Sequence, residues 1–194
     1  MPRTRSVPEI EVLEQAMRVF WAKGYDRASV ADICKATGLG PSSIYNAFGS
    51  KLELYRQTLK HYMDTYGSPV MKCMDDSIPA SRSLHELLRE YVNLIFEPET
   101  PPGSYLMQSG GTGVSQNSEA CAITNETKQS IANVIQRMLE TRQQAGDKLS
   151  APPRTLAIFL VMTARGLSQL ACDGYSPEDL IAVADLASKS CVLA

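Results

Sequence analysis

The chain has 194 residues, of which 44% are hydrophobic and 21% charged, and its formal net charge is −2 at pH 7. This length suits a single helical core with a small extra module, and the composition is that of a soluble globular protein. No apolar run reaches the length of a membrane span and no basic segment leads into an apolar one, so we expect a cytoplasmic protein without a membrane partner.

The chain lacks the residue spacing of a catalytic or metal site. Its two histidines, His61 and His85, lie in helical stretches without a recognisable nucleophile or acid pair, so we expect no enzyme. The scattered cysteines favour reduced thiols over a disulfide framework or a metal site, and we expect no cofactor; they are Cys34, Cys73, Cys121, Cys172 and Cys191.

Charge is divided unevenly along the chain. Residues 1–60 carry nine Lys and Arg against six Asp and Glu, a net +3, whereas residues 61–194 carry ten against fifteen, a net −5. A cationic first part on an acidic remainder is typical of a protein that binds a polyanion, although a solvated surface can give the same balance.

Helix signals run through the chain and strand alternation is missing, which predicts an all-α fold. The first helix is expected from Pro8 to Lys23, with Gly24 as its stop. Its apolar residues recur at steps of three and four and predict one buried stripe, made of Ile10, Leu13, Ala16, Met17, Phe20 and Trp21.

Two short helices are expected next. Ser29 can cap the first of them, with Asp32 completing a capping box, and Gly38 can form the turn that ends it. The second opens at Pro41, directly after Gly40, and is broken by Gly49. Ser50 then caps a longer helix with an apolar and aromatic side: Leu52, Leu54, Tyr55, Leu59, Tyr62, Met63 and Tyr66.

Two short helices joined by a glycine-containing turn and braced by an amphipathic helix are typical of a helix-turn-helix DNA reader. Ile44 and Phe48 would anchor the second short helix, and its remaining side chains would face a major groove: Pro41, Ser42, Ser43, Tyr45 and Asn46. Tyr45 and Lys51 could each contact a DNA phosphate. The alternative is that Tyr45 packs at the rim and Lys51 is merely solvated.

The stretch ASVADICKATGLGPSSIYNAFGSKLELY resembles the DNA-binding signature of the tetracycline-repressor (TetR) family of bacterial transcription regulators. The resemblance covers roughly residues 8–60. It implies that Ser29 is the capping position, Gly38 the turn, Phe48 the core anchor, and Tyr45 and Lys51 the phosphate contacts. Pro41-Ser42 and Asn46-Ala47 depart from the common pattern and leave the operator sequence open. The predicted DNA-binding set is Ser29, Gly40, Pro41, Ser42, Ser43, Tyr45, Asn46 and Lys51.

We therefore expect a three-helix DNA-binding domain over residues 1–50 and a helical ligand-binding and dimerisation domain over residues 51–194. Connections are predicted at Ser77–Ser83, Phe96–Ser104, Gln108–Ser118 and Gln143–Pro153. The helices between and after them are Leu84–Ile95, Glu119–Arg142, Arg154–Cys172 and Pro177–Val192.

The last two of these helices are apolar around much of their circumference, so they need cover on most sides. A second copy of the chain is the natural cover, and the resemblance implies the same four-helix dimer interface. The alternative is a monomer whose own core buries them.

Tyrosine combines an apolar ring with a polar hydroxyl, and methionine has an apolar side chain that adapts its shape. Both suit a pocket for a hydrophobic or aromatic effector. The candidates are Tyr62, Met63, Tyr66, Leu87, Tyr91, Leu94, Ile95, Met107, Phe159 and Met162, with plain core packing as the competing interpretation for most of them. Arg165 interrupts an apolar helix; we favour an ion pair across the dimer over a contact with an anionic effector.

Some relatives in the resembled family carry Gly-Cys after the proline-rich loop, but this chain has Gly103-Ser104, so cysteine sensing is not transferred to that position. Cys121 has no cation cluster near it in sequence, which favours an inert thiol.

The sequence thus predicts a dimeric repressor that binds a palindromic double-stranded DNA operator and is released by an unidentified small effector. A regulator without an effector, whose larger domain only dimerises, is the main alternative; activation with the same fold is also open.

Overall fold

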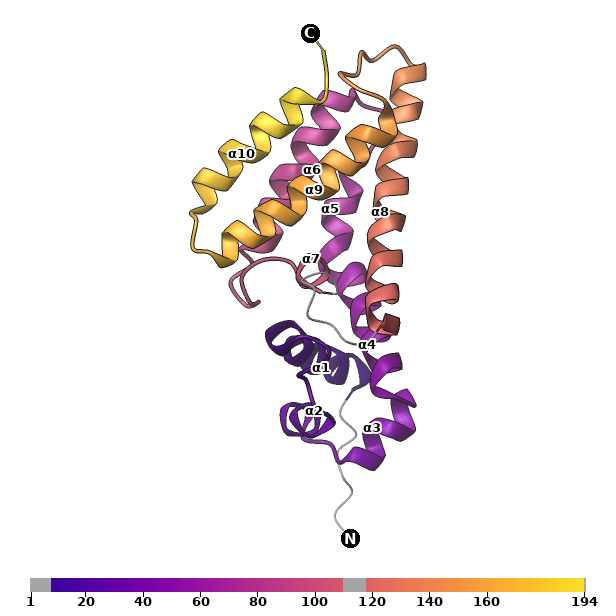
Figure 1. Cartoon of the computed structure of the whole chain (residues 1–194), viewed down its shortest axis with the longest axis vertical. Helices are drawn as coiled ribbons and strands as arrows, with labels where there is room; N and C mark the ends of the chain where they lie inside the picture. The colour runs from indigo at the N-terminus through magenta and orange to yellow at the C-terminus, as the bar shows by residue number, and fades with distance from the viewer. Residues whose placement is uncertain (1–7, 110–117, 194) are drawn as a thin grey trace.

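A computed structural model of the chain describes residues 8–109 and 118–193 (Figure 1). The described residues form helices without a named strand, and the predicted all-α class is confirmed. A head of three short helices lies at one end of the elongated molecule, and a larger helical body occupies the rest.

The head consists of α1 (Glu9–Lys23), α2 (Val30–Thr37) and α3 (Pro41–Phe48). Local signals set these bounds: Ser29 and Asp32 form the capping box of α2, and Gly24, Gly38 and Gly49 follow the three helices with positive φ angles. Pro8 caps α1 instead of opening it. Ile10, predicted to be buried, is 62% exposed, and Val12 occupies the buried stripe in its place.

The helix α4 (Lys51–Tyr62) joins head and body. It continues into η1, a π-helical turn (Met63–Gly67), and then into α5 (Ser68–Lys72). Pro69 lacks the N–H that would bond to the carbonyl four residues back, and Gly67 adds backbone freedom, which together account for the irregular turn. The sequence pattern predicts one continuous helix through Tyr66 and misses this turn.

The body contains α6 (Ala80–Ile95), α7 (Tyr105–Gln108), α8 (Ser118–Gln144), α9 (Pro153–Cys172) and α10 (Pro177–Ser190). The predicted connection at Ser77–Ser83 is too long, because α6 already begins at Ala80. Its first N–H donates to the Asp147 carboxylate at 2.7 Å, a cap that comes from a distant segment. Short α7 has no counterpart in the prediction, and residues 110–117 of the predicted Gln108–Ser118 connection lie outside the described residues.

The helix α9 contradicts the expectation that no apolar run reaches the length of a membrane span. Among the described residues it alone has the length and apolar composition of a membrane span. Its buried side packs in the body between α6, α8 and α10, and its outer side is exposed.

Candidate nucleic-acid interface and internal cavity

The helix α3 presents a polar outer face on an apolar anchor. Ile44 and Phe48 are 2% and 3% exposed and fix the helix to the head, while Tyr45 is 47% exposed. The other predicted groove residues are also exposed: Gly40, Pro41, Ser42, Ser43 and Asn46. A short helix with small hydrogen-bonding side chains on its free face can enter a major groove.

Ser29 helps to position this face by capping α2. Its hydroxyl oxygen accepts from Asp32 N–H at 3.1 Å, and its own N–H donates to Asp32 Oδ2 at 2.9 Å. Lys23 donates to the other oxygen of Asp32 at 2.5 Å. The hydrogen bonds from Lys23 and then from Ser29 hold the pKa of Asp32 well below its usual value. The carboxylate therefore fastens α1 to the start of α2, which sets the position of α3.

Lys51 begins α4, and its ammonium lies 4.3 Å from the centroid of the Tyr25 ring. The side chain is half-buried, and this burial lowers its pKa, against the opposing charge of Asp26. One N–H of the first turn of α4 is capped by Ser50, whose hydroxyl oxygen accepts from Glu53 N–H at 3.0 Å. A cation at a helix N-terminus favours an anionic partner such as a DNA phosphate.

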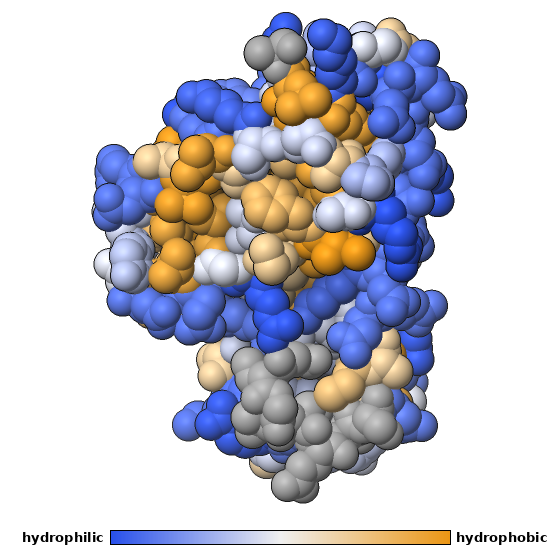
Figure 2. All heavy atoms as spheres, turned by 45° about the horizontal axis from the view of Figure 1, so that its top comes forward, coloured by the Kyte–Doolittle hydropathy of each residue, from blue (hydrophilic) through white to orange (hydrophobic). Residues whose placement is uncertain are grey.

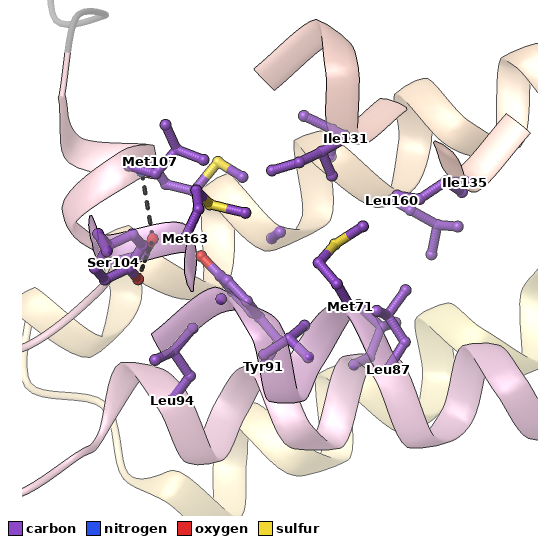
Figure 3. Close-up of a pocket in the computed structure, with 17 residues that line it drawn as sticks. Met63, Met71, Leu87, Tyr91, Leu94, Ser104, Met107, Ile131, Ile135 and Leu160 are labelled. Atoms are coloured by element: carbon purple, nitrogen blue, oxygen red, sulfur yellow. Dashed lines mark hydrogen bonds between the residues drawn. The ribbon is translucent and has the colours of Figure 1, made fainter. Parts of the chain in front are cut away.

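An apolar cavity of about 60 Å³ lies in the body (Figure 3). Six of the predicted effector residues line it: Tyr62, Met63, Leu87, Tyr91, Leu94 and Met107. The sequence did not point to Ser104, Met71, Ile131, Ile135 or Leu160, which also line it, because their inward direction depends on how α5, α7, α8 and α9 pack.

Five other predicted effector residues do not line this cavity. Ile95 is fully buried core, and Tyr66 faces the head. Phe159 packs against the core from a half-buried position. Met162 and Arg165 are exposed on α9 and line a separate hollow beside α1.

Polar groups at the cavity wall come from α4, α6 and the start of α7. Tyr62 Oη and Ser104 Oγ are 3.0 Å apart, and the N–H of Ser104 donates to Ser168 Oγ at 2.9 Å. Gly103, with φ +85°, brings the chain so close that a Cβ there would lie 2.8 Å from the Ser168 carbonyl oxygen. Glycine is therefore needed to seat Ser104 at the wall.

A cluster of four side chains, which we call the Glu14 cluster, connects the head to this region. The Glu14 carboxylate of α1 is 3.0 Å from His61 Nε2, accepts from Tyr66 Oη at 2.8 Å, and accepts from Arg18 Nε at 3.0 Å. Arg18 also donates to the carbonyl of Glu99. Burial opposes ionisation of Glu14, but the bonds from His61, Tyr66 and Arg18 outweigh it, so the pKa of Glu14 lies below its usual value.

Aromatic side chains of the head pack against aromatic side chains of α4 and α7. Trp21 of α1 lies 5.5 Å from Tyr62 and 5.7 Å from Tyr105, measured between ring centroids, and Phe20 lies 5.2 Å from Tyr55. Such pairs add to the free energy of apolar burial. Head and body are therefore held by one shared aromatic core at α1, α4 and α7.

A cationic pair lies near Cys121, which the sequence alone does not indicate. Burial, followed by the charge of Arg165, lowers the pKa of Lys128 to about 8, and Cys121 opposes this shift. Lys128 donates to the Ser109 carbonyl at 2.7 Å. The three side chains thus belong to one electrostatic neighbourhood on α8 and α9.

An apolar patch covers the outer side of α9 and α10 (Figure 2). Ile158 and Met162 of α9 are 55% and 62% exposed, and Val183 and Leu186 of α10 are 42% and 71% exposed. Their spacings of four and three residues place each pair on one helix face. Exposed large apolar side chains gathered in this way mark an interaction surface.

Known proteins resemble the chain both in its head and along most of its length. Residues 12–58 match the family described as bacterial regulatory proteins, tetR family. The HTH-type transcriptional repressor ComR of Escherichia coli (strain K12) is 29% identical over 180 residues, which cover 89% of this chain and 83% of that protein. The repressor BdcR of the same strain is 28% identical over 188 residues, covering 96% and 89%.

Among solved structures, a cysteine mutant of the TetR family transcriptional regulator CifR, complexed with 26-bp double-strand operator DNA, has a TM-score of 0.87 and 29% identity. The match covers 98% of this chain and 100% of that one. The head with its outward α3, the helical body, and these relatives together place the chain in the tetR family of bacterial regulatory proteins.

Proposed function

We propose that this chain is a dimeric cytoplasmic transcriptional repressor that binds a palindromic DNA operator and leaves it when a small, mainly apolar effector enters the body. The observation that carries the proposal is the polar outer face of α3, anchored by Ile44 and Phe48 within the tetR-type domain. The operator complex of CifR and the repressor names of ComR and BdcR support it.

In this proposal residues 1–50 form the DNA-binding unit and residues 51–194 the effector and dimer unit. Tyr45 and Lys51 contact phosphates, Gly40 and Pro41 open α3, and Ser42, Ser43 and Asn46 face base edges. Ser29 acts through the capping box that positions α3. The apolar patch pairs two copies and sets two α3 helices about 34 to 36 Å apart, one turn of DNA.

The route from cavity to head runs through η1. Met63 and Gly67 of this turn line the cavity, whereas Tyr66 of the same turn bonds to Glu14 on α1. An effector that moves Met63 would therefore shift η1 and the Glu14 cluster with it. A coupling free energy of about 1–3 kcal/mol would change operator affinity roughly 5- to 150-fold.

A specific observation favours a second candidate, a repressor that responds to no effector. The cavity of about 60 Å³ is far smaller than the roughly 300 Å³ at which drug-sized ligand sites begin. In that case the body serves dimerisation, and the cavity is a packing defect.

The test is selection of bound duplexes from a random DNA pool at a stated salt concentration. We expect enrichment of a palindrome with half-sites about one helical turn apart. Two matched exposed substitutions provide the control: Asn46→Glu, on α3, should abolish enrichment by repelling phosphates, and Asn133→Glu, on α8, should preserve it. A folded dimer that enriches no sequence would contradict the proposal.

A further inference from the structure

The wall of the internal cavity holds one hydroxyl with unused hydrogen-bonding capacity. Tyr62 and Ser104 satisfy each other at 3.0 Å. Tyr91 is 6% exposed, and its hydroxyl has no hydrogen-bond partner among the described residues. Tyr91 lines the cavity, and Figure 3 shows its hydroxyl directed toward the side of the wall where Met63 and Ser104 lie.

The neighbouring serines do not complete this hydrogen bond. Ser104 Oγ already lies in hydrogen-bond contact with Tyr62 Oη and the Met107 N–H, and Ser168 Oγ accepts from the Ser104 N–H. Both serines temper the rise in the pKa of Tyr91 that burial causes, but neither reaches the geometry of a bond to it. A buried hydroxyl without a partner is unfavourable and rare, so it calls for a group that enters the cavity.

The rest of the wall specifies what kind of group this is. Apart from the hydroxyls of Tyr62, Tyr91 and Ser104, the lining side chains are aliphatic or methionine, and no charged side chain lines the cavity. A charged ligand would lose its hydration without a counter-charge. A phenol that stays protonated can donate its hydrogen to an acceptor on the ligand.

We propose that the cavity binds a small neutral compound, apolar apart from one hydrogen-bond acceptor such as a carbonyl oxygen, and that the Tyr91 hydroxyl donates to this acceptor. This inference rests on the proposed function, because it names the chemical class of the effector for the same cavity. It assigns Tyr91 a role in specificity that Tyr62, whose hydroxyl is already bonded to Ser104, does not share.

Methionines account for the entry of such a compound. A benzene-sized ligand fits a cavity of about 150 Å³, so the about 60 Å³ present must widen. Met63 also lines a surface groove of about 260 Å³ between α4 and α8. Because methionine side chains adapt their shape at low cost, rotation of Met63 would join the groove to the cavity.

The experiment compares two ring compounds of nearly the same shape, cyclohexanone and methylenecyclohexane, which differ in C=O against C=CH₂. Binding of each to the full chain is measured by calorimetry or by ligand NMR, for the wild type, Tyr91→Phe and Tyr175→Phe. Tyr175→Phe is the matched control, since Tyr175 is 52% exposed and does not line the cavity.

We expect Tyr91→Phe to weaken cyclohexanone binding about 3- to 10-fold, as loss of one hydrogen bond does, and to leave methylenecyclohexane within about twofold. Tyr175→Phe should change the binding of neither compound. Equal effects of Tyr91→Phe on both compounds, or no binding of cyclohexanone to the wild type at millimolar concentration, would overturn the inference.

Operator binding by the same preparations separates this inference from the proposed function. A protein that binds its operator and neither ring compound refutes the ligand class and retains the DNA-binding role. A protein that binds cyclohexanone through Tyr91 and no DNA sequence retains the ligand class and refutes the repressor.

Discussion

At the residue scale, Lys51 holds a cation at the start of α4 while packing it 4.3 Å from the centroid of the Tyr25 ring. The ring and partial burial restrict the side chain, so its amino group is prepositioned for a phosphate instead of moving freely in solvent. This arrangement connects the predicted phosphate contact to a particular pair of side chains.

We expect Lys51→Ala to weaken binding across all DNA sequences and to reduce the slope of log affinity against log salt by about one unit. Tyr45→Phe should weaken binding without changing the slope, because it removes a neutral donor. Fluorescence anisotropy at several salt concentrations measures both effects. Lys60→Ala is the control, since Lys60 pairs with Asp64 at the far end of α4; an unchanged slope in Lys51→Ala would remove Lys51 from the interface.

Lys128 gives a pH prediction. Its folded pKa of about 8 is below its ordinary value, with burial as the largest cause. At pH values between the folded and the unfolded pKa, the unfolded chain binds more protons than the folded one, so the free energy of unfolding rises with pH in this range. Below pH 8 the buried charge of Lys128 lowers the free energy of unfolding.

The stability of Lys128→Met relative to the wild type should therefore fall by roughly 1–2 kcal/mol as the pH rises from 7 to 10, after allowance for solvent screening of this partly exposed group. Urea unfolding of both proteins at a series of pH values measures the difference. A difference that stays constant with pH would show that the folded lysine titrates like the unfolded one.

At the scale of elements, η1 has the cavity on one side and the head on the other. An added Cβ at Gly67 would lie 2.9 Å from Met63 Cε and 3.1 Å from Met63 Sδ, so Gly67→Ala would displace the Met63 side chain as an effector would. The φ angle of Gly67 is negative, and alanine adds no backbone strain there.

We expect Gly67→Ala to lower operator affinity about 5-fold or more while the protein stays folded, as a coupling of at least 1 kcal/mol requires. In a Met63→Ala background the clash is gone and the same substitution should have little effect; in a Tyr66→Phe background the link to Glu14 is cut and the effect should shrink. Operator titration of the wild type and the five variants measures both cycles. Equal losses in all backgrounds would mean that η1 does not carry the coupling.

The contrast between the head and the body shows which elements a sequence can specify. In the head, Ser29, Gly38 and Pro41 are local signals with fixed positions relative to the helices they start or end, so α2 and α3 follow the predicted bounds. In the body, the start of α6 depends on Asp147, and η1 depends on how Pro69 interrupts a helix that is otherwise regular in pattern. Contacts between residues that are distant in sequence produce no periodic pattern from which they could be predicted.

The candidate sites follow the same division. The exposed face of α3 follows from its helical period, because Ile44 and Phe48 mark the opposite side. The cavity is formed where α4, η1, α5, α6, α7, α8 and α9 meet. The apolar and aromatic character that suggested Tyr62, Met63, Tyr91 and Met107 also fits residues packed in or against the core, such as Ile95 and Phe159. Residue type alone cannot distinguish a residue that lines a cavity from one that is packed in the core.

At the scale of the whole molecule, an acidic body carries a cationic head, and the apolar patch lies on the body. The body's net charge of −5 keeps its own surface away from DNA, which leaves the head to make the approach. A single head offers one short helix to the groove, so two heads must act together to give useful affinity and to read a palindrome.

Leu186 tests this dependence because it is the most exposed large apolar side chain of the described residues, at 71%. Leu186→Glu should place a charge in the centre of a desolvated interface, convert the protein to monomers in analytical ultracentrifugation, and lower operator affinity by at least about 10²-fold through loss of bivalent binding. Ile10→Glu on α1, at a side chain that is 62% exposed, controls for the change of charge and should leave the oligomeric state intact. If Leu186→Glu remained a dimer with full operator affinity, the two heads would have to be joined by another surface, and the exposed sides of α9 and α10 would then be free for a different partner.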